Sequence, residues 1–197
     1  MSNPDGPPSP AAGPAARAGL RADARRNQQA VFAAACEVFA AQGMEATIPV
    51  IAERAGVGKA TVYRSYPTKG DLVEAVAREQ IRWLDALAAE AEQHEDAFQA
   101  LADLLGEIAA RLAEDRLFGQ VLGRADQWRG DHERAGVLDR IVAAAQRQGT
   151  LRPDATTTDL QVLVSGFSTV LLDRDDRDPA TWRHYVALVL DALRPPR

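Results

Sequence analysis

The sequence has little that would suit a secreted, disulfide-bonded or membrane-embedded protein. Cys36 is its only cysteine, which excludes a disulfide within the chain. The N-terminus lacks the order of basic and then apolar residues that is typical of a secretion signal. The longest apolar stretch, from Val162 to Leu172, is interrupted by polar and small residues and is too short to span a bilayer. We therefore expect a cytoplasmic protein with no membrane partner.

The sequence also lacks motifs for catalysis or metal binding. The histidines, His94, His132 and His184, lie far apart and have no cysteine or carboxylate at metal-ligand spacing. There is no Ser-His-Asp order, no glycine-rich phosphate loop and no nucleophile elbow. We expect neither a metal nor another cofactor, and we expect no enzymatic activity.

A net charge of −5 opposes nucleic-acid binding, but the charges are unevenly distributed. Between Arg17 and Gly70 there are eight Lys and Arg against four Asp and Glu, whereas residues 71–197 hold fifteen against twenty-three. Both lysines of the chain, Lys59 and Lys69, fall in the basic segment. Only this N-terminal segment is therefore suited to a polyanionic partner.

Abundant Ala, Leu, Arg and Glu favour helix, while residues 1–20 are rich in Pro, Gly and Ala and predict a disordered tail. Apolar residues at helical spacing predict an all-α fold of about nine helices. Their expected ranges are 23–41, 47–55, 59–65, 69–90, 96–113, 115–125, 133–148, 154–173 and 179–193. Thr68 and Asp71 form a capping-box pattern, and Asp178-Pro179 is typical of a helix start. Cys36 lies on the apolar stripe of the first helix, as a small buried side chain would.

The stretch from Thr47 to Tyr66 predicts a helix-turn-helix. Two short helices flank a turn in which Gly56 permits the positive φ that a tight connection needs. Apolar residues on the inner sides of both helices would pack together, which leaves the outer side of residues 59–64 available to the major groove of DNA. Such helix pairs also occur where no DNA is bound, so the spacing alone leaves a purely structural role as an alternative.

Residues 25–73 carry a set of side chains in a characteristic order, namely Ala34-Ala35, Phe39, Gly43, Thr47, Ile51-Ala52, Ala55-Gly56-Val57, Thr61-Val62-Tyr63, Tyr66, Lys69 and Leu72. In this order and spacing the segment resembles the DNA-binding domain of the TetR family, the tetracycline-repressor-like regulators. The C-terminal half resembles one group of actinobacterial-type members at Leu151-Arg152-Pro153-Asp154, at Trp182 and from Tyr185 to Leu193. The resemblance implies a DNA-binding domain over residues 21–67 and a helical effector-binding and dimerisation domain over residues 68–197.

The resemblance also implies which residues contact duplex DNA. Gly58 would start the recognition helix, Tyr63 would place its hydroxyl on a phosphate, and Lys69 would bind another phosphate. The full expected set is Arg25, Arg26, Thr47, Gly58, Lys59, Ala60, Thr61, Tyr63, Arg64 and Lys69. Without the resemblance, Lys69 and Arg64 would be interpreted as solvated surface charges and Tyr63 as a half-buried core residue.

Three positions depart from the family pattern. Pro49 stands where some relatives send a long polar side chain to a base, so that contact cannot form here. Ser65 stands where relatives often have His or Arg, which would weaken one contact with the DNA backbone. Val50 is apolar where a charged residue is usual.

In TetR-like proteins the middle helices enclose an apolar effector pocket, and the last two helices pair with a second subunit. The aromatic residues expected at a small-molecule effector are Trp83, Phe98, Phe118, Trp128 and Phe167, although packing alone would account for any one of them. The last two predicted helices are apolar on more than one side, which suits a homodimer interface. The residues expected there are Leu163, Phe167, Val170, Tyr185, Leu188 and Val189.

These features predict a homodimeric transcriptional repressor that binds a palindromic double-stranded operator and releases it when a small-molecule effector binds. The runner-up is a small-molecule-binding or enzymatic helical protein that kept the TetR fold but lost DNA binding. A weaker alternative is a scaffold that acts through its dimer surface. Steep salt dependence of DNA binding would distinguish the first function from the other two.

Overall fold

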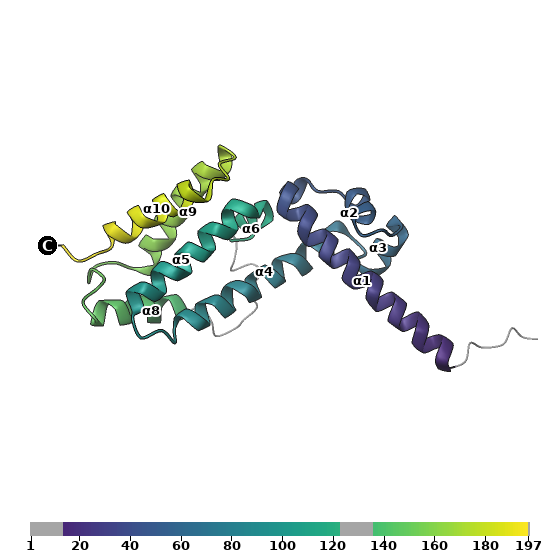
Figure 1. The fold of residues 1–197 in the computed structure, drawn as a ribbon, viewed down its shortest axis with the longest axis horizontal. Helices are drawn as coiled ribbons and strands as arrows, with labels where there is room; N and C mark the ends of the chain where they lie inside the picture. Colours follow the sequence, from purple (N-terminus) through teal and green to yellow (C-terminus); the bar gives the residue numbers. More distant parts are fainter. Residues whose placement is uncertain (1–13, 123–135, 197) are drawn as a thin grey trace, which may run out of the picture.

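The computed structural model describes residues 14–122 and 136–196, and the regular structure of these residues is entirely helical (Figure 1). The elements are α1 (Pro14–Gln42), η1 (Gly43–Glu45), α2 (Ile48–Arg54), α3 (Lys59–Ser65), α4 (Lys69–Ala91), α5 (Ala97–Glu114), α6 (Arg116–Leu122), α8 (Val137–Arg147), α9 (Thr157–Asp173) and α10 (Pro179–Ala192). Element η1 is a short 3₁₀ helix and the others are α-helices. The predicted all-α fold class is confirmed.

Local sequence signals explain where several helices begin. At the start of α4, Thr68 Oγ1 accepts a hydrogen bond from Asp71 N at 3.1 Å, and Asp71 Oδ2 accepts one from Thr68 N at 2.8 Å. Thr156 and Asp159 form the same capping box before α9, and the Asp178 side chain caps α10. Each box satisfies two backbone N–H groups that a helix start leaves without partners. The capping box predicted at Thr68 is therefore present.

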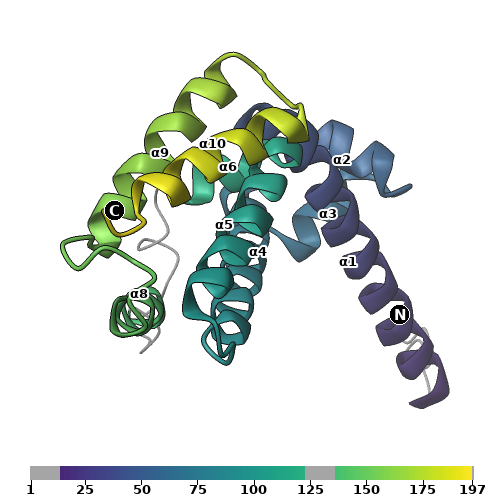
Figure 2. The same ribbon diagram turned by 60° about the vertical axis from the view of Figure 1, so that its left-hand side comes forward.

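The helices build two hydrophobic cores that share α4 and α6. The N-terminal core contains α1, α2, α3, the first half of α4 as far as Ile81, and Leu117 and Val121 of α6. The C-terminal core contains Leu84 of α4 and Phe118 of α6 together with α5, α8, α9 and α10. Figures 1 and 2 show α4 running from the group of α1, α2 and α3 toward α5 and α8. The N-terminal core thus extends past residue 67 into α4.

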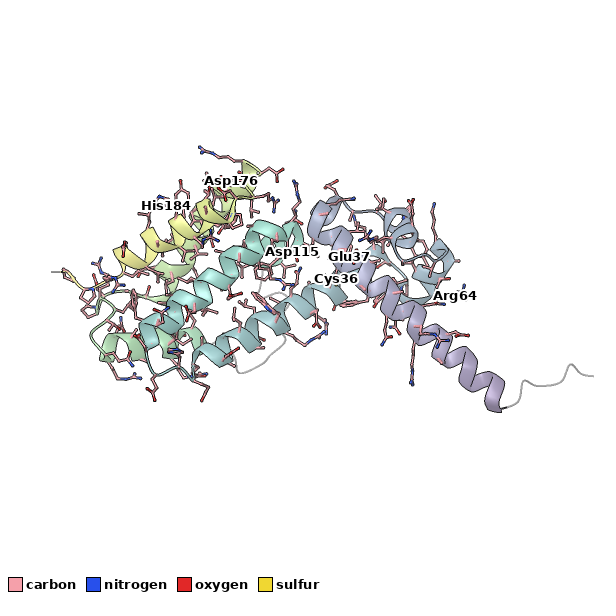
Figure 3. All side chains as sticks on the ribbon, in the orientation of Figure 1. Cys36, Glu37, Arg64, Asp115, Asp176 and His184 are labelled. Atoms are coloured by element: carbon pink, nitrogen blue, oxygen red, sulfur yellow. The ribbon has the colours of Figure 1, made fainter. Side chains whose placement is uncertain are left out.

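A buried polar contact lies where the two cores meet. Gln80 Nε2 donates to Asp115 Oδ2 at 2.8 Å, and Asp115 Oδ1 accepts from Phe118 N at 2.9 Å. Cys36 of α1 lies close to this junction (Figure 3). Burial raises the pKa of the Cys36 thiol, and the negative charge of Asp115 raises it further. The thiol therefore stays protonated at neutral pH and packs as a small side chain against the N-terminal core.

The start of α1 differs from the sequence-based expectation. This helix begins at Pro14 rather than at Asp23, so residues 14–20 are helical and do not belong to a disordered tail. Proline is tolerated in a first helical turn, and the alanine-rich residues that follow have high helix propensity. Once α1 exists, extending it costs less than starting a new helix.

Some predicted positions fall outside the described residues. They include Trp128, the end of the helix expected over 115–125 and the start of the one expected over 133–148. Across the described ranges, none of the helices combines the length and apolarity needed to cross a membrane.

Candidate nucleic-acid interface

The helix-turn-helix consists of α2, α3 and the turn between them, on the opposite side of the molecule from α8, α9 and α10 (Figure 1). Gly56 in the turn has a φ of 66°, a left-handed conformation that glycine adopts without a side-chain clash. Val57 N donates to Ala52 O at 3.0 Å across the turn. Ile51 and Val62 are fully buried beneath it. This packing fixes α3 on the surface of the N-terminal core.

The outer side of α3 is exposed and carries polar groups that have no internal partner. Lys59 and Ala60 are exposed at the start of the helix, and Tyr63 is 48% exposed one turn later. Within the described residues, neither Lys59 nor Tyr63 makes a side-chain hydrogen bond or ion pair. Thr61 lies beside them and is half-buried. An ammonium and a phenol group in this arrangement can bind phosphate or base-edge acceptors without breaking an existing contact.

The expected arginines differ in how firmly they are held. The Arg64 side chain, seen near the end of α3 in Figure 3, lies back along its own helix and donates to Ala60 O at 3.3 Å. Arg26 forms an exposed ion pair with Asp23 on α1. Arg25 is exposed and makes no such contact within the described residues. Exposed pairs contribute only about 0–1 kcal/mol, so these side chains can exchange their partners for phosphate.

Lys69 is ordered rather than freely solvated. It is half-buried at the first position of α4, and its Nζ donates to Met44 O at 2.5 Å. The backbone N–H of Met44 in turn donates to Gln120 Oε1 of α6 at 3.0 Å. An ammonium group carries three protons, so Lys69 retains donors for an outside acceptor while its position is set from within the protein.

Thr47 and Gly58 occupy the N-cap positions of α2 and α3. Both have an extended backbone, and neither helix start has a side-chain cap hydrogen bond. Thr47 therefore caps α2 through its backbone conformation only. The hydrogen bond that a threonine side chain can make at an N-cap position is not formed. The first N–H groups of both helices lack a side-chain acceptor at the cap.

The three departures from the family pattern are all at or near this surface. Pro49 is exposed in the first turn of α2, where its missing N–H leaves no bond unmade. Val50 is 36% exposed, and nothing in the structure explains an apolar residue there. Ser65 is the half-buried last residue of α3.

Two contacts that support this surface were not expected from the sequence. Arg54 at the end of α2 pairs with Glu37 of α1, which joins these helices across the outside of the domain. Met44 and Gln120 join η1 to α6. No local sequence pattern marks either contact, because helical spacing reports on neighbours within one helix and not on partners from separate helices.

The comparisons with known proteins agree with this geometry. Residues 31–76 match the family model described as bacterial regulatory proteins, tetR family. The crystal structure of a TetR transcription regulatory protein from Mycobacterium vanbaalenii is 30% identical over 89% of this chain and 99% of that chain, with a TM-score of 0.54. The chain belongs to the TetR family. As a member of this family, it is a DNA-binding transcription regulator.

Other solved structures share the same fold. A TetR transcriptional regulator from Streptomyces coelicolor is 26% identical, covers 86% of this chain and 99% of that chain, and has a TM-score of 0.56. FadR from Bacillus subtilis, solved in complex with stearoyl-CoA, is 17% identical over 84% of this chain and 99% of that chain, with a TM-score of 0.59. No curated protein matches the sequence at a significant level.

The expected effector aromatics of this TetR-family chain do not gather around one cavity of the described structure. Trp83 and Phe118 pack edge to face with ring centroids 5.6 Å apart. Phe98 is buried in the C-terminal core, and Phe167 stacks on Tyr185 with ring centroids 5.8 Å apart. All four side chains therefore take part in packing.

A cavity of about 600 Å³ lies elsewhere, between the end of α4, the start of α5, and α8. Its lining includes His94, Arg140 and Arg147, and none of the four aromatic residues. Arg140 also pairs with Glu92, and this contact lowers the pKa of the Glu92 carboxyl. This cavity therefore does not coincide with the effector site that the aromatic residues predicted.

The last two helices, α9 and α10, expose apolar side chains at four of the positions that the sequence predicts for the dimer interface. Their exposed fractions are 40% for Leu163, 48% for Val170, 37% for Tyr185 and 50% for Leu188. Phe167 is half-buried.

Val189 corrects the expected dimer set. It is only 8% exposed, because it lies on the inner stripe of α10 together with Trp182, Val186 and Leu193. These positions recur at helical spacing and pack into the C-terminal core of the same chain. Val189 therefore does not belong to the surface that is open to a partner.

Proposed function

We propose that this TetR-family chain is a homodimeric repressor whose two recognition helices bind the two halves of a palindromic operator. The observation that carries the proposal is the outer side of α3, where Lys59 and Tyr63 are exposed and have no partner among the described residues. This face belongs to the one segment of the chain with excess positive charge. Cationic and hydroxyl donors on a helix that fits the major groove suit duplex DNA.

A second copy of the chain is needed to read a palindrome. The exposed apolar residues of α9 and α10 support a two-fold interface, because the same face on each copy can cover the other. Gly166 lies on the exposed side of α9, between Leu163 and Val170, and allows close approach of a partner helix. A dimer then has to hold its recognition helices about one DNA turn apart, roughly 34 Å.

A small-molecule effector would control that spacing. A ligand that binds better to a dimer with badly spaced recognition helices must weaken DNA binding by linkage. The structures of FadR with stearoyl-CoA and of RolR with resorcinol support the view that this fold accommodates quite different small molecules. In this chain the C-terminal core and the cavity between α4, α5 and α8 are the regions where such a ligand would act.

The experiment starts with selection of a binding site from random duplex DNA by the wild-type protein. We expect enrichment of a palindrome, and a dissociation constant of roughly 10⁻⁸ M or lower that rises steeply with salt. Light scattering at micromolar concentration should give the mass of a dimer. If no sequence is enriched and binding to duplex DNA is weak at low salt, the chain is instead a helical protein that has lost DNA binding.

A further inference from the structure

A line of contacts leads from α6 to the DNA-binding surface. Gln120 Oε1 accepts a hydrogen bond from Met44 N at 3.0 Å, and Met44 O accepts one from Lys69 Nζ at 2.5 Å. Met44 thus contributes both of its backbone polar groups, one on each side. The three residues are distant in sequence and come from α6, η1 and α4.

The turn that contains Met44 has little freedom to move on its own. Gly43 is buried and has a φ of 58°, a conformation that other residues rarely adopt. A Cβ atom added to Gly43 would lie 3.1 Å from Gln120 Oε1, so the Gln120 amide is seated directly on this turn. Ala46 closes the turn by donating to Gly43 O at 3.2 Å and is itself fully buried. The turn and the Gln120 amide are therefore in direct contact.

Helix α6 is held from both sides of the molecule. Leu117 and Val121 are buried in the N-terminal core, while Phe118 is buried in the C-terminal core. A Cβ atom at Gly119 would lie 2.7 Å from Leu172 Cδ1 of α9, which shows how closely these two helices approach. Figure 1 shows α6 next to the C-terminal end of α1, at the junction of the two halves.

A charged contact fixes the same helix to the end of α9. Arg116 Nη2 lies 2.7 Å from Asp175 Oδ1, just after α9. Helices α6 and α9 are thus joined both by the close packing at Gly119 and by this exposed ion pair. Helix α9 also carries part of the exposed apolar face, at Leu163 and Val170.

We propose that Gln120 is a positioning residue for operator binding, which acts by holding Met44 so that the Met44 carbonyl orients Lys69. The proposal rests on the proposed function, because it gives Lys69 a phosphate of the operator as its second acceptor. Gln120 itself touches no DNA. Its effect on affinity requires the Lys69 ammonium, and this requirement separates positioning from a general structural role.

The test is a double-mutant cycle on an operator selected from random duplex DNA by the wild-type protein. The variants are Gln120→Leu, Lys69→Ala and the combination of both, with affinity measured by fluorescence anisotropy at two salt concentrations. Gln120→Ser serves as a second variant, because serine is polar but too short to reach Met44. Gln93→Leu is the matched control, since Gln93 is exposed beyond the end of α4, remote from Met44.

We expect Gln120→Leu and Gln120→Ser each to weaken operator binding roughly three- to tenfold, as the loss of one hydrogen bond predicts. In the Lys69→Ala background the same changes should have no further effect, and Gln93→Leu should bind like the wild type. Thermal unfolding of each variant verifies that it is folded.

An equal loss in both backgrounds would overturn the proposal, and so would unchanged affinity of Gln120→Leu. Unchanged affinity of Lys69→Ala would overturn it as well, because Lys69 would then bind no phosphate. The proposed function fails separately, if the wild-type protein enriches no sequence in the selection step. The two failures are therefore distinguishable.

Discussion

Lys59 and Tyr63 offer DNA two different kinds of contact from the same side of α3. The Lys59 ammonium can donate to a guanine edge or to a phosphate, whereas the Tyr63 hydroxyl adds a single donor. We expect Lys59→Ala to weaken operator binding by about 1–3 kcal/mol and Tyr63→Phe by about 1 kcal/mol. Neither change should lower the melting temperature, because both side chains are exposed and have no partner among the described residues.

Titration of a selected operator by gel shift measures both effects. Arg174→Ala is the control, since Arg174 is an exposed cation at the end of α9, outside the helix-turn-helix. If Lys59→Ala binds as tightly as this control, the major-groove role of α3 is wrong.

For single residues, the sequence predicts those features that depend only on neighbours within the same helix. Lys59 and Tyr63 lie one helical turn apart, so they share a helix face whatever the rest of the chain does. The hydrogen bonds that hold Met44 between Gln120 and Lys69 depend on how three elements meet, and no local pattern contains that information. For the same reason the sequence wrongly predicts Val189 at the partner surface, because apolar spacing alone does not say which stripe faces the chain's own core.

Among the elements, α4 begins with a capping box whose loss should be measurable. Thr68→Val keeps the shape of the side chain but removes the oxygen that accepts from Asp71 N. We expect a loss of about 1 kcal/mol of unfolding free energy, which corresponds to a melting temperature lower by roughly 2–4 °C. Thr158→Val is the control, because Thr158 is exposed in the first turn of α9 and its side chain makes no hydrogen bond within the described residues. Equal melting temperatures for the two variants would show that the box contributes nothing.

The connection between α9 and α10 has its own anchor in Arg177. The Arg177 Nη1 donates to Ala113 O at 2.9 Å, at the end of α5, while its Nε pairs with Asp175 Oδ1 at 2.9 Å. A cation at the C-terminal end of a helix satisfies carbonyl groups that have no partner within the helix. We therefore expect Arg177→Ala to destabilise the protein by about 1–2 kcal/mol in urea unfolding.

The neighbouring Arg174 provides the comparison. It is exposed, and its side chain makes no hydrogen bond within the described part of the chain. Arg174→Ala should leave the urea midpoint unchanged. Equal midpoints for Arg174→Ala and Arg177→Ala would mean that the carbonyl contacts of Arg177 are not stabilising.

The extent of each element is predictable only in part. The start of α4 was predicted from the Thr68 and Asp71 pattern, which lies within one turn of helix. The start of α1 was missed, because a segment rich in Pro, Gly and Ala has the composition of a disordered tail. Its helical state depends on attachment to a helix whose later turns are anchored in the core.

For the molecule as a whole, the decisive property is the apolar surface that α9 and α10 leave uncovered. Among the described residues, most of the exposed large apolar side chains belong to these two helices, and such a gathering on one face is typical of an association surface. Leu188, which is 50% exposed, is the most sensitive place to test it on α10. A cation introduced there would have to be buried without a partner, once in each copy of a two-fold interface.

We expect light scattering at micromolar concentration to give the mass of a monomer for Leu188→Arg. Its circular dichroism should remain helical, and it should still unfold in a cooperative thermal transition. Its affinity for the full palindrome should fall by roughly 10²-fold or more, because the two half-sites are no longer bound by linked recognition helices. Its affinity for a single half-site should not change, since α3 is intact. Ala86→Arg, which introduces the same side chain at an exposed position of α4, should remain a dimer and bind the palindrome normally. A dimeric Leu188→Arg protein would place the interface elsewhere. A monomeric one that still binds the palindrome tightly would show that dimerisation through α9 and α10 is not what couples the two halves of the operator.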